Sequence, residues 1–401
     1  MFGMSVSEVE VVRVAARGDG VTSDGRHFPL TAPGDWVGED GTIRFGPHHR
    51  TPPCRHFPSC GGCQLQHLDD AAWSRFLAER VRTALAAQGL ETEIRTPLLS
   101  PPRTRRRATL HAERRGKQVR IGFTEAGSHK LIDLAECHVL APALFALLAP
   151  LRRLFATLLP DARRVNVHLA LSDQGRDVLV EGIDPEGLAA AEAITTFAQA
   201  EKLARFAIDE GFGPTARWEP VPVTVTLGGV AVPLPSGSFL QATPEGEAAL
   251  VTAVREIVGE ARTVADLFAG LGTFTFALER ARVYAGEAAR DAILSLKAAA
   301  GAAGRQIVGD HRDLFRRPLT TVELDRFDAI VLDPPRAGAR EQVGELAGAK
   351  APVVAYVSCN PSTFARDAEI LCKGGYRLEW VQPVGQFRWS THVELAGKFT
   401  R

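Results

Sequence analysis

The chain has 401 residues, of which 45% are hydrophobic and 23% are charged. This composition is typical of a soluble globular protein, excludes a disordered or fibrous chain, and at this length predicts two or three domains. The 47 basic and 47 acidic residues balance each other, which argues weakly against a nucleic-acid partner because contacts with phosphates favour an excess of Lys and Arg.

The N-terminal region predicts a small β unit over residues 1–50. Alternating apolar residues predict a strand over residues 9–14, and Gly18-Asp-Gly20 indicates a turn. Residues 1–8 lack both the basic and the apolar region of a signal peptide. We therefore expect a cytoplasmic protein.

Four of the six cysteines form a candidate metal-binding set. Cys54, Cys60 and Cys63 have the spacing C-x5-C-x2-C, and Cys137 follows 74 residues after Cys63. Four thiolates, three of them in a loop rich in Gly and Pro, suit an iron–sulfur cluster or a structural zinc ion, and spacing does not separate the two. A disulfide framework is disfavoured in so long a chain without an export signal. Unpaired structural thiols are the remaining alternative.

The region over residues 51–235 mixes helices with short strands. Helical periodicity covers residues 71–87, and strands are predicted over residues 119–123, 165–169 and 177–180. The most apolar stretch, residues 141–160, is interrupted by Pro150 and two arginines, which predicts two packed helices with a break between them and not a membrane span.

A run of basic residues lies within this region. Between Arg103 and Lys130 there are nine basic and two acidic residues. Because the whole chain is neutral, this run predicts a local and directional basic patch. A solvated arginine-rich face with no binding role is the alternative.

From residue 236 the pattern changes to alternating strands and helices. A helix is predicted over residues 273–280, and strands over residues 263–268, 282–287, 306–310, 327–333 and 352–357. Such alternation predicts a parallel sheet with helices on both faces. Ligands of these sheets bind at the carboxyl ends of the strands.

Several of these carboxyl ends carry residues that could bind a ligand or take part in catalysis. Gly270-x-Gly272 allows the backbone to approach a ligand, and Glu287 stands 21 residues after Asp266, where a carboxylate can accept hydrogen bonds from a ribose. NAD-binding proteins use the same arrangement, so this pair does not choose the cofactor. Asp333, followed by two prolines at the end of the fourth predicted strand, resembles the motif of methyltransferases that act on planar bases.

A thiol and a second carboxylate follow the Asp333 motif. Cys359 lies 26 residues after Asp333, and Glu394 lies 35 residues after Cys359. In this setting the sequence resembles the uracil-5 RNA methyltransferases, which make 5-methyluridine with S-adenosylmethionine. The segments that fall where this family has its motifs are residues 238–242, 266–274, 332–338, 358–363 and 392–394.

The resemblance implies an α/β fold with three parts. A Rossmann-like class I methyltransferase domain with a doubly wound, mostly parallel sheet would span residues 236–401. An α+β RNA-binding domain that carries the iron–sulfur cysteines would span residues 51–235. Residues 1–50 would form a shortened TRAM-like β unit of the OB type.

The resemblance also implies a role for each site residue. Cys359 would add to carbon 6 of uracil, for which it needs a lowered pKa, and Glu394 would remove the proton from carbon 5. The residues at S-adenosylmethionine positions are Gln241, Phe268, Glu287 and Asp333, with Asp310 as a contact to adenine. The members with a similar cysteine set carry a [4Fe–4S] cluster, which here would use Cys54, Cys60, Cys63 and Cys137.

The implied partner is RNA, with 23S ribosomal RNA favoured and transfer RNA as the alternative, and the implied state is a monomer. The target uridine must leave its base pair to reach Cys359.

The chain departs from the family at Thr243 and Thr273, where relatives commonly have Asn, and this puts the affinity for the cofactor in question.

A cytosine-5 methyltransferase is a weaker hypothesis, since those RNA enzymes have a cysteine directly after a proline of the Asp333 motif, and this chain has Arg336 there. A non-catalytic RNA-binding or redox-sensing protein is the alternative from another class.

Overall fold

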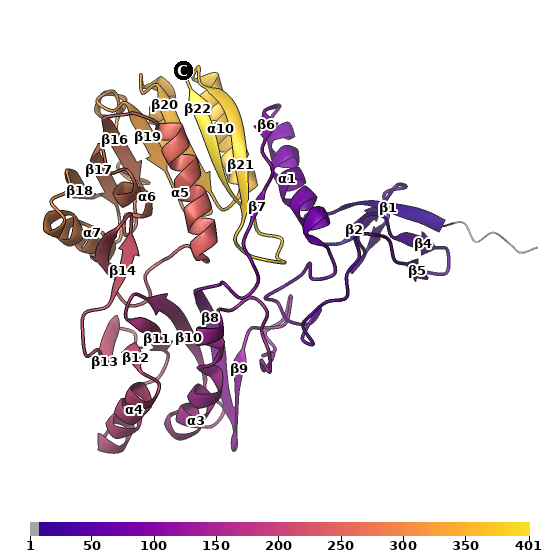
Figure 1. Cartoon of the computed structure of the whole chain (residues 1–401), viewed down its shortest axis with the longest axis vertical. Coiled ribbons are helices and arrows are strands. Elements are labelled where there is room, and N and C mark those ends of the chain that lie inside the picture. The colour runs from indigo at the N-terminus through magenta and orange to yellow at the C-terminus, as the bar shows by residue number, and fades with distance from the viewer. Residues whose placement is uncertain (1–7) are drawn as a thin grey trace, which may run out of the picture.

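The structure is a computed structural model that describes residues 8–401. Figure 1 shows three parts: a small N-terminal sheet that projects to one side, a central α+β unit, and a larger sheet covered by helices. Within the described residues, no helix is both long and apolar enough to cross a membrane.

The N-terminal part is a five-stranded sheet with the order β3-β2-β1-β4-β5. The predicted strand over residues 9–14 is confirmed as β1, and Gly18 adopts φ 104° in the turn that follows. Residues 1–7 of the predicted unit, and nearly all of the segment judged for a signal peptide, lie outside the described residues. The TRAM resemblance stays a prediction. The strands are β1 (Glu8–Val14), β2 (Gly20–Thr22), β3 (His27–Phe28), β4 (Trp36–Gly38) and β5 (Ile43–Arg44).

The central part is a six-stranded sheet with the order β13-β12-β11-β10-β8-β9. All three strands predicted here are confirmed, as β9, β10 and β11. The strands are β8 (Arg107–Arg115), β9 (Gln118–Gly122), β10 (Arg164–Ser172), β11 (Gly175–Glu181), β12 (Leu203–Asp209) and β13 (Pro214–Trp218), and the helices are α2 (Pro142–Phe145), α3 (Leu148–Leu158) and α4 (Leu188–Ala200). The helices bury apolar residues of the sheet, such as Leu110, Val167 and Phe206, on one face.

The break in the apolar stretch lies earlier than its proline. The two helices α2 and α3 are separated at residues 146–147, and Pro150 stands in the first turn of α3. Proline is tolerated there because the first N–H groups of a helix have no intrahelical partner.

The C-terminal sheet has the order β18-β17-β16-β19-β20-β22-β21-β6, with β7 also paired to β21. The five predicted strands are confirmed as β16 to β20, all parallel, whereas β22 runs antiparallel to both of its neighbours. The strands are β6 (Glu93–Ile94), β7 (Leu98–Leu99), β16 (Thr263–Leu267), β17 (Arg282–Glu287), β18 (Ile307–His311), β19 (Ala329–Leu332), β20 (Val353–Ser358), β21 (Arg377–Gly385) and β22 (Glu394–Thr400). A separate hairpin pairs β14 (Thr224–Leu227) with β15 (Val230–Pro233).

Helices cover both faces of this sheet, as predicted. On one face α1, α9 and α10 pack over a core that contains Ile330, Tyr356 and Phe399. On the other face α5 packs over Val331, Val357 and Ala396, and α7 contacts β15, β17 and β18. The helices are α1 (Asp70–Ala86), α5 (Pro244–Val258), α6 (Thr273–Ala277), α7 (Arg290–Ala302), α8 (Thr321–Leu324), α9 (Arg340–Gly348) and α10 (Pro361–Lys373). The predicted helix at residue 273 is therefore shorter than expected.

An early segment of the chain joins this late sheet. Strands β6 and β7 pair in parallel with β21, and α1 packs against α10 and β21 (Figure 1). The division of the chain at residues 50 and 235 stays a prediction, and these contacts place part of the segment 51–235 on the C-terminal sheet.

Candidate active site

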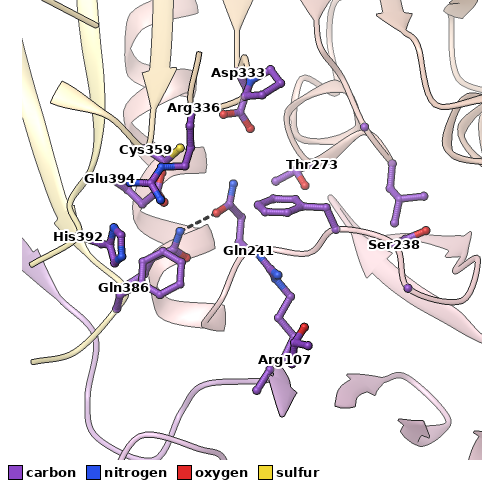
Figure 2. Close-up of a pocket in the computed structure, with 18 of the residues that line it drawn as sticks. Arg107, Ser238, Gln241, Thr273, Asp333, Arg336, Cys359, Gln386, His392 and Glu394 are labelled. Carbon is purple, nitrogen blue, oxygen red and sulfur yellow. Dashed lines mark hydrogen bonds between the residues drawn. The ribbon is translucent and has the colours of Figure 1, made fainter. Parts of the chain in front are cut away.

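A cavity of about 1220 Å³ lies where strand β8 of the central part faces the carboxyl edge of the C-terminal sheet. Its walls come from distant parts of the sequence, including Gly61, Arg107, Phe268, Cys359 and Glu394. The two sheets thus enclose one site between them, and Figure 2 shows how its side chains converge.

The two residues predicted to react lie together in this cavity. Cys359 directly follows β20, and Glu394 is the first residue of β22. Because β22 is antiparallel to β20, with Ser358 opposite Leu395, its first residue lies beside the carboxyl end of β20. Figure 2 shows Cys359 and Glu394 next to each other, with Arg336 beside them.

The carboxyl group of Glu394 is almost completely buried, with 6% of the residue exposed. Burial raises its pKa from 4.5 to about 7, although a hydrogen bond from Gln386 and the charges of Arg107 and Arg336 act in the opposite direction. A carboxyl group with a pKa near neutrality can accept a proton and release it again.

The thiol of Cys359 does not have the lowered pKa that its predicted role requires. Burial raises this pKa to about 11, and the negative charges of Glu394 and Asp333 act in the same direction. Arg336 opposes the rise. A thiol with such a pKa is mostly protonated at neutral pH.

The four residues predicted at S-adenosylmethionine positions, Gln241, Phe268, Glu287 and Asp333, all line the same cavity. Phe268 has φ 65° in the turn after β16, and its ring lies 5.4 Å from that of Phe315. The Glu287 carboxylate accepts hydrogen bonds from the backbone N–H groups of Gly270, at 2.9 Å, and Ala289, at 2.6 Å. These bonds fix the glycine turn against the end of β17, which is where a ribose would lie.

Gln241 and Asp333 occupy the part of the cavity nearest Glu394. The buried Gln241 side chain accepts a hydrogen bond from Gln386 at 2.8 Å (Figure 2). Burial raises the pKa of Asp333 well above its usual value, and the charges of Glu394, Asp266 and Glu287 add to the rise. A cavity bordered by so many carboxyl groups suits a ligand that carries positive charge.

The two positions that depart from the family have different local roles. Thr243 is the N-cap of α5: its hydroxyl accepts a hydrogen bond from the N–H of Gly246 at 3.0 Å and contacts the Ser100 hydroxyl at 2.7 Å. Thr and Asn are both good N-cap residues, so this exchange preserves the helix start. Thr273 is the first residue of α6 and lines the cavity.

Asp310 was expected to contact adenine, but it does not line the cavity. Its carboxylate accepts a hydrogen bond from the Tyr284 hydroxyl at 2.6 Å. Leu314 and Phe315, a few residues later, line this end of the cavity instead.

The arginine run does not form a solvated face over its first half. Arg106 is partly buried and forms an ion pair with Glu247 of α5, and Arg107 lines the cavity with its guanidinium 4.2 Å from the Phe239 ring. Arg105 also lines the cavity and is buried enough for its pKa to fall. Arg105 and Arg107 of this run thus place positive charge on the cavity wall.

The four cysteines of the predicted set gather around one small cavity, although Cys137 is distant in sequence. Burial raises the pKa of Cys63 to about 12, and the charges of the other three thiols add to the rise. The donor set and its convergence fit a cluster held by four thiolates. Nevertheless, across residues 8–401 no group of three or more His, Cys, Asp or Glu side chains is arranged to hold a metal ion.

Sequence reasoning missed Gln386 and His392 as cavity residues. Gln386 follows β21, a strand that the sequence analysis did not predict. The alternation of polar and apolar residues over residues 377–380 was the available signal.

This chain is similar to known RNA methyltransferases. Residues 305–400 match the family model described as tRNA (Uracil-5-)-methyltransferase. An uncharacterized RNA methyltransferase of Zymomonas mobilis is 49% identical over 394 residues, which cover 98% of this chain and 99% of that protein. The 23S rRNA (uracil(1939)-C(5))-methyltransferase RlmD of Halomonas elongata is 34% identical over 370 residues, which cover 86% of this chain and 75% of that protein.

Among solved structures, the tRNA (uracil-54, C5)-methyltransferase of Pyrococcus abyssi in complex with S-adenosyl-L-homocysteine is similar, with a TM-score of 0.73 and 22% sequence identity. The match covers 98% of this chain and 100% of that chain. At this identity the likeness establishes a shared fold.

Proposed function

Because the chain belongs to the RNA (uracil-5-)-methyltransferases, we propose that it forms 5-methyluridine in 23S ribosomal RNA through a covalent adduct with Cys359. Its fold is that of the class I methyltransferases, and S-adenosylmethionine is the methyl donor. The observation that carries the proposal is the convergence of Cys359, Glu394 and Asp333 in one cavity with Gln241.

The covalent route follows from the weak nucleophilicity of carbon 5 of uracil. The Cys359 thiolate forms a bond to carbon 6, which converts the ring to an enolate. Carbon 5 then takes the methyl group of S-adenosylmethionine, which ends as S-adenosylhomocysteine. Glu394 removes the proton from carbon 5, the enolate forms again, and cleavage of the bond between carbon 6 and sulfur releases 5-methyluridine and the thiolate.

The electrostatics of the cavity support this division of roles. Glu394 has a pKa near 7, which suits a base that takes a proton and returns it to water in each cycle. The high pKa of Cys359 in the free protein makes thiolate formation dependent on bound ligands. Arg336 is the cation of the protein that favours the thiolate.

The cavity also has the shape that two substrates require. One end is lined by Phe268, Glu287 and Phe315, and we assign it to S-adenosylmethionine. The other end is lined by Arg105, Arg107 and His111 of the central part, and we assign it to RNA. The target uridine would enter between them as an extruded base.

The choice of ribosomal RNA is supported by the relative from Halomonas elongata, whose name specifies a 23S rRNA uracil. Transfer RNA remains the alternative. A cytoplasmic location and a monomeric state stay predictions.

The test is incubation of the protein with S-adenosylmethionine and bulk RNA from a strain that lacks the gene, followed by nucleoside mass spectrometry. We expect 5-methyluridine in the 23S fraction, and none with the Cys359→Ala variant. Product confined to transfer RNA would overturn the ribosomal assignment. No product in any RNA would favour a binding protein without activity.

We further propose that Cys54, Cys60, Cys63 and Cys137 hold a [4Fe–4S] cluster with a structural role. All four ligands come from the protein, and the methyl transfer requires no electron. The cluster would fix the loop over residues 60–64 against the cavity, since Gly61, Gly62 and Gln64 line the cavity wall.

Anaerobically purified protein should therefore contain iron and sulfide and show cluster absorbance. Cys63→Ser should lose both, whereas Cys372→Ser, a half-buried cysteine near the end of α10, is the matched control and should retain both. Equal iron content in the two variants would contradict the assignment.

A further inference from the structure

The segment between β21 and β22 brings a buried amide into the centre of the cavity. Gln386 directly follows β21 and is 2% exposed. It lies in the cavity near Glu394 and His392, and its amide points toward Gln241 (Figure 2).

The amide group of Gln386 forms a hydrogen bond on each side. Its nitrogen donates to the side-chain oxygen of Gln241 at 2.8 Å, and its oxygen accepts from the backbone N–H of Ala242 at 2.9 Å. It also lies close to the Glu394 carboxyl group, whose pKa it lowers. A side-chain amide has two N–H donors and one oxygen acceptor, so a single Gln can satisfy all three partners.

The surroundings leave Gln386 little freedom to move. A Cβ atom added at Gly246, in the first turn of α5, would lie 2.5 Å from the Cβ of Gln386 and 3.0 Å from its side-chain oxygen. Only a glycine allows this close approach, so the start of α5 holds the amide in place.

From this geometry we propose that Gln386 is a positioning residue that links the cofactor contact Gln241 to the general base Glu394. The proposal rests on the proposed function, since it uses the roles assigned there to both residues. In this arrangement the amide orients the Gln241 side chain toward S-adenosylmethionine and holds the Glu394 carboxylate toward carbon 5 of the uracil.

Two consequences follow, and a purely structural residue would not produce both. Loss of the amide frees the Gln241 side chain, which weakens binding of S-adenosylhomocysteine by about threefold to tenfold. It also removes a neighbouring amide that favours the ionised form of Glu394, so the acidic limb of the pH–rate profile moves about one pH unit upward.

The experiment compares Gln386→Leu and Gln386→Glu with Gln382→Leu as the matched control. Gln382, within β21, is also a buried glutamine, but its amide donates to the carbonyls of Thr96 and Pro383, away from the cavity. Titration calorimetry with S-adenosylhomocysteine gives the affinity, and turnover across pH gives the profile. Both Gln386 variants should change both quantities, and the control should change neither.

The Gln386→Glu variant keeps an acceptor for the Ala242 N–H but loses the donors and adds a negative charge beside Glu394. Its acidic limb should move further than that of Gln386→Leu. This variant decides the question if the leucine variant fails to fold. A folded Gln386 variant with the affinity and pH profile of the parent would overturn the proposal, and a changed affinity with an unchanged profile would overturn the link to Glu394. If the parent itself makes no 5-methyluridine, the proposed function fails, while the affinity measurement still decides whether Gln386 positions Gln241.

Discussion

Replacing Glu394 with glutamine should slow the enzyme and stabilise the protein at the same time. Glutamine has nearly the shape of the glutamate but cannot take the proton from carbon 5. Loss of a general base costs about 10²- to 10⁴-fold in rate. Because methyl transfer precedes this proton removal, the variant should also accumulate a covalent complex between Cys359 and methylated RNA.

The gain in stability follows from the raised pKa. The pKa of Glu394 is about 7 in the folded protein and 4.5 for an unperturbed group, and each unit of difference corresponds to about 1.36 kcal/mol. Below pH 4.5 the carboxyl group is protonated in both states, so the substitution has no electrostatic effect. As the pH rises, the unfolded chain loses its proton first and the wild type is destabilised, by about 3 kcal/mol above pH 7.

Urea unfolding of wild type and Glu394→Gln at pH 5 and at pH 8.5 measures this difference. The variant should be more stable by about 3 kcal/mol at pH 8.5 and by less than about 1 kcal/mol at pH 5. Glu260→Gln, at an exposed glutamate just after α5, is the control and should show no such trend. Equal stability of wild type and Glu394→Gln at pH 8.5 would refute the claim that burial sets the pKa of Glu394.

Three further outcomes are expected. Cys359→Ala should form no covalent complex with RNA that contains 5-fluorouridine, yet bind S-adenosylhomocysteine within about twofold of wild type, as a gel-shift assay and calorimetry would show; a persisting complex would remove Cys359 as the nucleophile. Thr243→Ala removes the N-cap bond to Gly246 and should lower the free energy of unfolding by about 1 kcal/mol in urea, whereas Thr243→Asn should lower it far less. Asp177→Ala removes the carboxylate paired at 2.6 Å with the buried guanidinium of Arg205, whose remaining ion partner is Glu219 at 3.9 Å; it should cost about 3 to 5 kcal/mol in the same assay, and a loss below 1 kcal/mol would contradict the role of this pair.

Local patterns predicted much of the C-terminal sheet. The apolar runs between turns became the strands β16 to β20. Strands β16, β19 and β20 are almost wholly buried, and a strand buried on both faces needs a continuous apolar segment. The final hairpin of β21 and β22 was missed, although it supplies Glu394 and leads into Gln386. Within β21 only residues 377–380 alternate in polarity, and the place of the hairpin in the sheet is set by the pairing of β22 with β20, which lies about 40 residues earlier in the sequence.

The sequence by itself determined which residues could do chemistry, because the thiol, the carboxylates and the glycine turn stand in motifs whose spacing follows from strand and helix lengths. Only the tertiary structure decided how these groups affect each other. The pKa of Cys359 goes up where the sequence led us to expect a decrease, because burial and two carboxylates act on it from separate strands. The proposed link from Gln241 through the Gln386 amide to Glu394 also depends on the tertiary structure. Hydrogen bonds and charges act between groups that are close in space, and Gln241 is far from the other two residues in sequence.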